Sequence, residues 1–169
     1  MRKATAEDAF DISRVQVTGW RIAYRHVFPP EALDAMPIDD EPWRTRLDRP
    51  PAGWRTFVAD DRGAVVGFAS LGPSRDVQGL GELYAIYVEP EAWSTGVGRA
   101  LLERAEAQLA AEYASAALWV LEENPRARVF YERAGWAPAG ARKAEERWGV
   151  RAPEVRYRKE LSTTESSPG

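Results

Sequence analysis

Apolar residues recur with two different spacings along this chain, which indicates that it folds from both strands and helices. The segments with a strand-like pattern are 2–5, 55–60, 64–71, 80–88, 116–121 and 154–161. The turn Asp61-Arg62-Gly63 joins two of these segments into a hairpin. A further strand is expected near Trp136.

Helix patterns fill most of the sequence between these strands. A capping-box-like start at Thr5 predicts a helix that ends about Gly19. The proline-rich segment 20–48 predicts helical pieces broken by turns. A longer helix is expected over 96–112, where apolar residues repeat every three or four positions.

A short helix should begin at Asn124-Pro125, where an N-cap residue precedes a proline, and end at Gly135. The resulting order of elements predicts an α/β fold with a mixed central β-sheet of about six or seven strands and helices on both faces. We expect one domain over residues 1–161, followed by a disordered polar tail at 162–169.

Composition and charge exclude several kinds of chemistry. The 169 residues include no cysteine and one histidine, His26, so a thiolate nucleophile and a His-rich metal site are excluded. The net charge of −3 gives no basic surface for nucleic acid. No apolar run is long enough to span a membrane, and the N-terminal residues lack the apolar core of a secretion signal. We therefore expect a cytoplasmic protein with neither nucleic-acid nor membrane partners.

The segment Glu89–Glu103 (EPEAWSTGVGRALLE) leads from an apolar strand through Gly96 and Gly98 directly into a helix. Small residues at such a start leave the unpaired N–H groups of the first helical turn accessible, and the helix dipole favours negative charge there. The segment is a candidate anion site, although a tight strand-to-helix turn without a ligand would have the same spacing.

Two segments resemble the GNAT superfamily of acetyl-CoA-dependent N-acetyltransferases. Glu82–Leu102 resembles the coenzyme A loop of that family, and Asn124–Trp136, which contains Phe130-Tyr131-Glu132, resembles its second motif. Shorter likenesses extend the resemblance over residues 1–161. The family usually has Gln or Arg where this chain has Trp93, and often a further glycine where this chain has Ser94.

The resemblance implies a GNAT fold with acetyl-CoA as co-substrate, its diphosphate lying at the start of the helix that begins at Gly96. This diphosphate is expected to contact the backbone of Thr95, Gly96, Val97, Gly98 and Arg99, and Trp93 and Ser94 are also expected to bind the cofactor. Ser94 and Thr95 can add hydroxyl donors. The pantetheine arm is expected to pair like an added strand with the backbone of Ile86, Tyr87 and Val88, beside Asn124 and Tyr131.

Glu82 is the candidate general base. Strand alternation places it on one face with Tyr84, Ile86 and Val88, an apolar setting that would raise the pKa of its carboxyl group. The resemblance also implies a catalytic glutamate at this position. The alternative is a glutamate at a strand end that reaches solvent.

Tyr131 is the candidate general acid for the leaving thiolate, and the backbone N–H of Val88 is the candidate oxyanion donor. Trp20, Tyr24 and Tyr84 are candidate walls of the acceptor pocket, because aromatic faces suit cations and apolar amines. The alternative for these four aromatic side chains is an ordinary place in the core.

These features predict an N-acetyltransferase that moves an acetyl group from acetyl-CoA to a primary amine of a small molecule or peptide. The amine would attack directly in a ternary complex, with no metal and no covalent enzyme intermediate. The alternative is a non-catalytic CoA-binding sensor or structural module with the same fold. A nucleotide-phosphate enzyme is disfavoured because no lysine follows the loop. A homodimer is left open.

Overall fold

The computed structural model describes residues 1–162, so all but the first residue of the predicted disordered tail lies outside the described residues. The strands are β1 (Arg2–Lys3), β2 (Arg55–Asp61), β3 (Ala64–Pro73), β4 (Gly81–Val88), β5 (Ser115–Leu121), β6 (Ala137–Arg147) and β7 (Val150–Glu160). The α-helices are α1 (Ala9–Ala23), α2 (Pro30–Asp34), α3 (Glu41–Asp48), α4 (Val97–Ala110) and α5 (Pro125–Arg133), and short 3-10 turns lie at Ala6–Asp8 and Pro90–Ala92.

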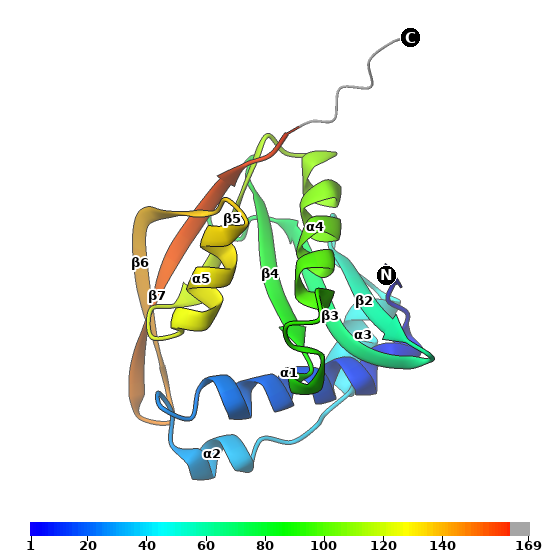
Figure 1. The fold of residues 1–169 in the computed structure, drawn as a ribbon, viewed down its shortest axis with the longest axis vertical. Helices are drawn as coiled ribbons and strands as arrows, with labels where there is room; N and C mark the ends of the chain where they lie inside the picture. Colours follow the sequence, from blue (N-terminus) through cyan, green and yellow to red (C-terminus); the bar gives the residue numbers. More distant parts are fainter. Residues whose placement is uncertain (163–169) are drawn as a thin grey trace.

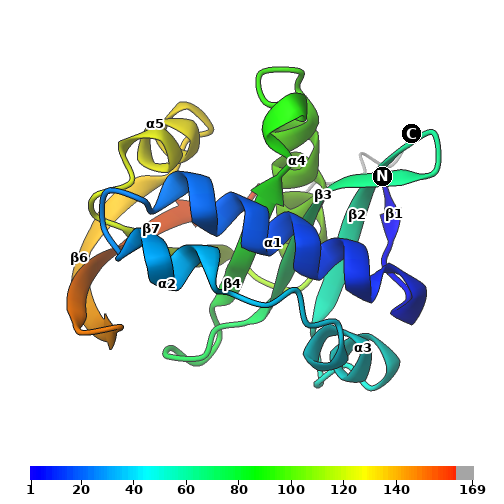
Figure 2. The same cartoon turned by 90° about the horizontal axis from the view of Figure 1, so that it is seen from below.

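The strands form one sheet in the order β1-β2-β3-β4-β5-β7-β6. All neighbouring strands are antiparallel except β4 and β5, which are parallel. Helices α4 and α5 lie on one face of the sheet, while α1 and α3 cover the other (Figures 1 and 2). The predicted mixed sheet of six or seven strands with helices on both faces is confirmed.

Strands β4 and β5 separate soon after they meet. Their pairing covers only Gly81–Leu83 against Ala116–Leu118, although both strands continue beyond it. From there the two halves of the sheet diverge toward the end that α1 crosses (Figure 1). A parallel pair that stops short leaves backbone groups of both strands without partners in the sheet. We call this opening the strand gap.

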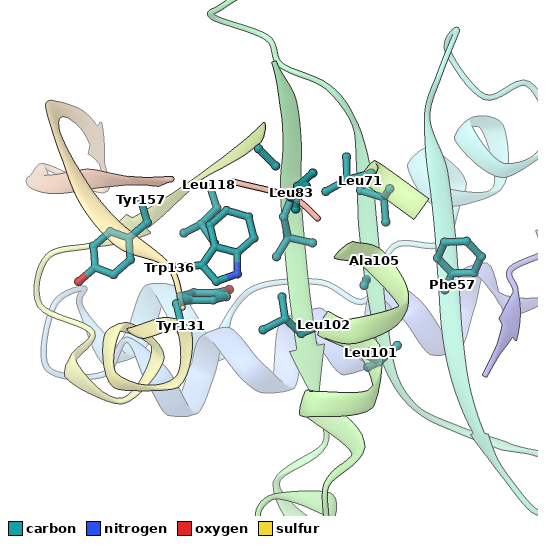
Figure 3. Close-up of a cluster of buried hydrophobic side chains, with 14 of the residues drawn as sticks. Phe57, Leu71, Leu83, Leu101, Leu102, Ala105, Leu118, Tyr131, Trp136 and Tyr157 are labelled. Carbon is teal, nitrogen blue, oxygen red and sulfur yellow. The ribbon is translucent and has the colours of Figure 1, made fainter. Parts of the chain in front are cut away.

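The largest core cluster fills the space between the sheet and helices α4 and α5 (Figure 3). Leu101 and Leu102 of α4 are fully buried against Leu83 of β4, and Tyr131 and Trp136 fill the α5 side. A second cluster lies under α1 and α3 around Ile12, Trp43 and Phe68. Within residues 1–162, no helix is both long and apolar enough to cross a membrane.

Helix α1 runs four residues beyond its predicted end at Gly19, to Ala23. Gly19 is buried, and a Cβ there would lie 2.8 Å from Cδ1 of Tyr87. The glycine therefore serves the close approach of α1 to β4 and does not end the helix. The capping box predicted at Thr5 is present, but it opens the 3-10 turn that leads into α1.

Candidate active site

Alternate residues of β4 direct their backbone N–H and C=O groups into the strand gap. The N–H of Glu89 donates to the carbonyl of Val66 on β3 (2.8 Å), while Val88 lies opposite Gly67. Because antiparallel pairs alternate between bonded and non-bonded, the N–H and C=O of Val88 point away from β3, and those of Ile86 do the same. Both residues therefore offer backbone groups to the gap, as pairing with a pantetheine arm requires.

Tyr87 lies between these two residues and has the opposite orientation. Its backbone groups face β3, and its partly buried ring packs against Gly19 of α1 and Phe68 of β3. Tyr87 was predicted to bind the cofactor, but this geometry gives it a packing role.

Helix α4 begins beside the gap with unpaired N–H groups. Its first intrahelical bond runs from the N–H of Ala100 to the carbonyl of Gly96 (3.0 Å), so the N–H groups of Val97, Gly98 and Arg99 precede it. Gly96 has a φ of 93° as the N-cap. A Cβ on Gly98 would be in ordinary contact with Phe130 and Val88, at 3.6 Å from each. The start of α4 can thus accept an anion on its backbone.

Ser94 has a φ of 62°, in the left-handed region that favours glycine. This conformation accounts for the glycine that the family often has here. The hydroxyl of the neighbouring Thr95 donates to the carbonyl of Ala92 (2.5 Å), so its proton is used within the loop. The predicted hydroxyl donation from Thr95 to a phosphate is thus not available in this conformation.

Trp93 connects the α4 loop to both sides of the gap. Its indole N–H donates to the carbonyl of Val88 (2.9 Å), and the guanidinium carbon of Arg126 on α5 lies 3.6 Å from its ring centroid. Trp93 was predicted to bind the cofactor, and this stays a prediction. Its indole N–H has a backbone partner on β4, and its ring face packs against a cation.

Glu82 lies one residue before the last β4–β5 pair, and its side chain is buried. Its neighbour Arg75, in the β3–β4 loop, donates its backbone N–H to Oε2 (2.9 Å) and its Nε and Nη2 to Oε1 (3.1 and 2.5 Å). The prediction that the carboxyl group lies in an apolar setting is therefore wrong, because it has a cationic partner. The alternative of a glutamate that reaches solvent is also wrong.

A β-bulge changes which residues share a face with Glu82. Leu83 pairs with Leu71 and Ala85 with Ser70, so Tyr84 is an extra residue without a partner on β3. After the bulge, Ile86 and Val88 pack in the α4 core cluster with Leu83. The predicted face of Glu82 with Ile86 and Val88 is therefore wrong, since the bulge reverses the alternation.

Tyr131 lies on α5 with its ring buried against Phe130 and Trp136, and its hydroxyl is directed toward β4 (Figure 3). Burial raises the pKa of this phenol above its usual value, and the nearby Tyr24 adds to the effect. Asn124, at the start of the same helix, accepts the N–H of Ala127 on its side chain (3.2 Å), so the predicted N-cap is confirmed.

The three predicted acceptor-pocket aromatics do not form one wall. Trp20 and Tyr24 meet edge to face, with ring centroids 4.8 Å apart. Tyr84 packs against Trp54 with the rings tilted and their centroids 4.2 Å apart, and its hydroxyl donates to the carbonyl of Pro73. Burial raises the pKa of Tyr24, and its phenol interacts with Tyr87 and Asn124. Trp20 and Tyr24 therefore lie near the gap, whereas Tyr84 packs in the β2–β4 region.

Several polar residues around the strand gap were not predicted from the sequence as site residues. Arg75 is one, and half-buried Glu154 of β7 is another: burial raises the pKa of its carboxyl group, and it interacts with Tyr24. Trp119 of β5 donates its indole N–H to Asp76 (2.8 Å). These residues lie on different strands and loops, so only the strand pairing could have brought them together.

Known proteins resemble this chain in both sequence and structure. Residues 17–136 match the acetyltransferase (GNAT) family. The Bacillus subtilis protein YuaI, described as an uncharacterised N-acetyltransferase, is 39% identical over 164 residues, which cover 92% of this chain and 89% of that protein. The chain belongs to the acetyltransferase (GNAT) family. It is accordingly an enzyme of the acyl-CoA-dependent N-acetyltransferase class, as the sequence motifs predicted.

Solved structures show the same fold. PaiA N-acetyltransferase from Thermoplasma acidophilum, in complex with coenzyme A, has a TM-score of 0.74 at 21% identity, covering 94% of this chain and 96% of that one. YncA from Salmonella typhimurium, with its cofactor acetyl-CoA, has a TM-score of 0.75 at 18% identity, covering 99% and 96%. These two GNAT-fold proteins bind CoA or acetyl-CoA.

Proposed function

We propose that this GNAT protein transfers an acetyl group from acetyl-CoA to a primary amine of a small molecule or peptide. The observation that carries the proposal is the continuity of two features: the unpaired N–H groups at the start of α4 and the backbone of Val88 facing the strand gap. The helix start suits a diphosphate, and the gap suits an extended chain that pairs with β4. Together they fit the two parts of one CoA molecule.

The residues present fit this co-substrate on the diphosphate side. Gly98 has no side chain between the helix start and Phe130, and Gly96 takes the left-handed conformation that turns the chain into α4. On the pantetheine side, the carbonyl of Val88 already accepts the indole N–H of Trp93. Pairing of the pantetheine arm with β4 therefore relies on the backbone of Ile86, which leaves the N–H of Val88 for the thioester oxygen.

The chemical roles are assigned to three residues. Bound acetyl-CoA would supply the acetyl group as an activated thioester. Glu82 takes the proton of the acceptor ammonium, directly or through water, while Arg75 holds the carboxylate in place. The N–H of Val88 donates to the carbonyl oxygen of the thioester as negative charge develops there. The hydroxyl of Tyr131 gives its proton to the departing sulfur.

The test is a screen of primary amines with acetyl-CoA that follows release of free thiol, together with thermal unfolding in the presence of coenzyme A or ATP. Coenzyme A should raise the midpoint and ATP at equal concentration should not. Gly98→Val should remove the shift, because its side chain covers the helix start. Equal protection by both ligands would contradict the proposal.

The same two measurements separate the enzyme from a non-catalytic CoA-binding module. Protection by coenzyme A without thiol release for any amine would favour the module. The non-catalytic module is favoured by the contacts that already occupy the carbonyl of Val88 and the carboxylate of Glu82.

A further inference from the structure

Arg156 of β7 lies on the same face of the sheet as Glu82. Glu82 pairs with Ala117 across β4–β5, and Trp119, two residues further along β5, pairs with Arg156 across β5–β7. Directly paired residues share a face, and so do residues two apart on one strand. Arg156 is thus two strands away from Glu82 and two residues further along, which is roughly 12 Å at the usual strand spacing and rise.

One buried donor of the Arg156 side chain lacks a hydrogen-bond partner within the described part of the chain. This donor is Nε, which is buried and has no hydrogen-bond partner there. The neighbouring carboxylates are engaged elsewhere: Glu82 with Arg75, Glu154 with Lys143, and Asp76 with the indole of Trp119. Buried polar side-chain atoms nearly always have a partner, so this donor is expected to bind a group from outside the chain, either a water or a ligand.

A second cation, Lys143, also lies beside the indole of Trp119. Nζ of Lys143 lies 4.5 Å from the ring centroid of Trp119, and the guanidinium carbon of Arg156 lies 5.5 Å from it. The ion pair of Lys143 with Glu154 is long, at 3.8 Å. Glu154 offsets part of the charge of Lys143, and the positive charge that remains beside Trp119 favours an anion. The planar fork of an arginine matches the two oxygens of a carboxylate.

We propose that the acceptor is a primary amine that also carries a carboxylate, which Arg156 and Lys143 bind while the amine lies beside Glu82. The separation of Arg156 from Glu82 favours an acceptor whose two groups are several atoms apart. This inference rests on the proposed acetyl transfer and narrows its substrate class.

The experiment compares two acceptors of equal chain length, 5-aminopentanoate and pentylamine, by free-thiol release with acetyl-CoA. The kcat/KM of the wild-type protein should be at least ~10-fold higher for the amino acid, the effect expected of a charge-assisted hydrogen bond. Arg156→Met should bring the ratio of the two values close to one, and Arg156→Lys should keep part of the preference. Arg158→Met is the matched control, because Arg158 shares the strand and face of Arg156 but donates to Ser115 (3.0 Å).

Equal kcat/KM values for the two acceptors in the wild-type protein would overturn the carboxylate site and leave acetyl transfer standing. The carboxylate site would also be overturned if Arg156→Met kept the full preference for the amino acid over pentylamine. If no amine releases thiol, the proposed function and the carboxylate site both fall. If Arg156→Met does not fold, the carboxylate site is still tested by the ratio of kcat/KM values for the two acceptors in the wild-type protein and in Arg156→Lys.

Discussion

Arg75 binds the carboxylate of Glu82 through three N–H groups, and the two side chains differ sharply in exposure: 51% for the arginine and 1% for the glutamate. Removing the exposed partner leaves a buried carboxylate unpaired. Arg75→Met should therefore lower the free energy of unfolding by about 2 kcal/mol, a value reduced by the solvent that screens Arg75. Urea unfolding at neutral pH measures the change.

The double variant Arg75→Met/Glu82→Gln is the control for that prediction. It removes the buried charge together with its partner, so much of the lost stability should return. A double variant less stable than Arg75→Met alone would show that the loss does not come from the unpaired carboxylate.

Glu82→Gln should keep coenzyme A binding and lose most activity near neutral pH. An aliphatic ammonium has a pKa of about 10, so nearly all the acceptor is protonated at neutrality and needs a base. Activity should recover in part at high pH, where free amine is present. The measurement is a pH–rate profile of both proteins with one acceptor.

Glu154→Gln provides the comparison, because burial raises the pKa of this carboxyl group and it interacts with Tyr24. If Glu154→Gln loses the neutral-pH activity and Glu82→Gln retains it, then the base is Glu154. Superimposed profiles for Glu82→Gln and the wild type would remove Glu82 from the mechanism.

Tyr131→Phe should reduce kcat by ~10²-fold with little change in coenzyme A binding, if the phenol is the general acid. Burial raises the pKa of Tyr131 above the ordinary value of about 10, so the phenol keeps its proton between neutral pH and pH ~10. The step that uses this proton should not slow across that interval. Stopped-time assays of thiol release measure kcat.

Tyr113→Phe is the matched control, since burial also raises the pKa of Tyr113, but its ring packs against Gly81 at the paired end of β4. Its kcat should match that of the wild type. An equal loss in both variants would mean that Tyr131 contributes only packing.

Asp8 should make stability depend on pH in the acid range. Its carboxylate accepts two bonds from Arg2 (2.7 and 2.8 Å) and the N–H of Thr5 (2.8 Å), and chiefly the bond with Arg2 lowers the pKa of Asp8. A folded-state pKa below the unfolded one contributes stability above the unfolded value of about 4, which is lost as pH falls through the folded value. Asp8→Asn should cost about 1–3 kcal/mol at pH 7.

The measurement is the unfolding free energy of Asp8→Asn and the wild type from pH 7 down to acid pH. The difference should shrink as the wild-type carboxyl group takes up a proton. A difference that stays constant with pH would show that packing of Asp8, and not its charge, stabilises this region.

Local patterns along the chain predicted most of the fold. The hairpin of β2 and β3, strands β4 and β5, and helices α4 and α5 follow apolar periodicity with capping residues at their ends. β6 was foreseen only as a strand near Trp136, because Ala137–Arg147 carries few large apolar residues and its structure depends on pairing with β7. Such tertiary stabilisation leaves little trace in the local pattern.

The site was predicted less completely because it depends on pairing between distant segments. The α4 loop and Tyr131 were found from motifs, whereas the bulge at Tyr84 could not be foreseen from alternation in β4 alone. The partners of Glu82 and Trp119, Arg75 and Asp76, come from a loop with no periodic pattern. Arg156 was not predicted as a site residue, because charged residues commonly alternate along a strand that has one solvated face.

The brief pairing of β4 with β5 also has a mechanical consequence. Strands β1–β4 form one wing of the sheet and β5–β7 the other, and in the sheet the two wings are joined only by the rungs from Gly81 to Leu83. Because so few residues pair at this junction, we expect the two wings of the sheet to change their relative angle more easily than neighbouring strands that pair along most of their length do. A ligand that forms hydrogen bonds with both sides of the strand gap would restrict this change of angle. Slower amide hydrogen exchange at Ile86 and Val88 in its presence would report that stiffening.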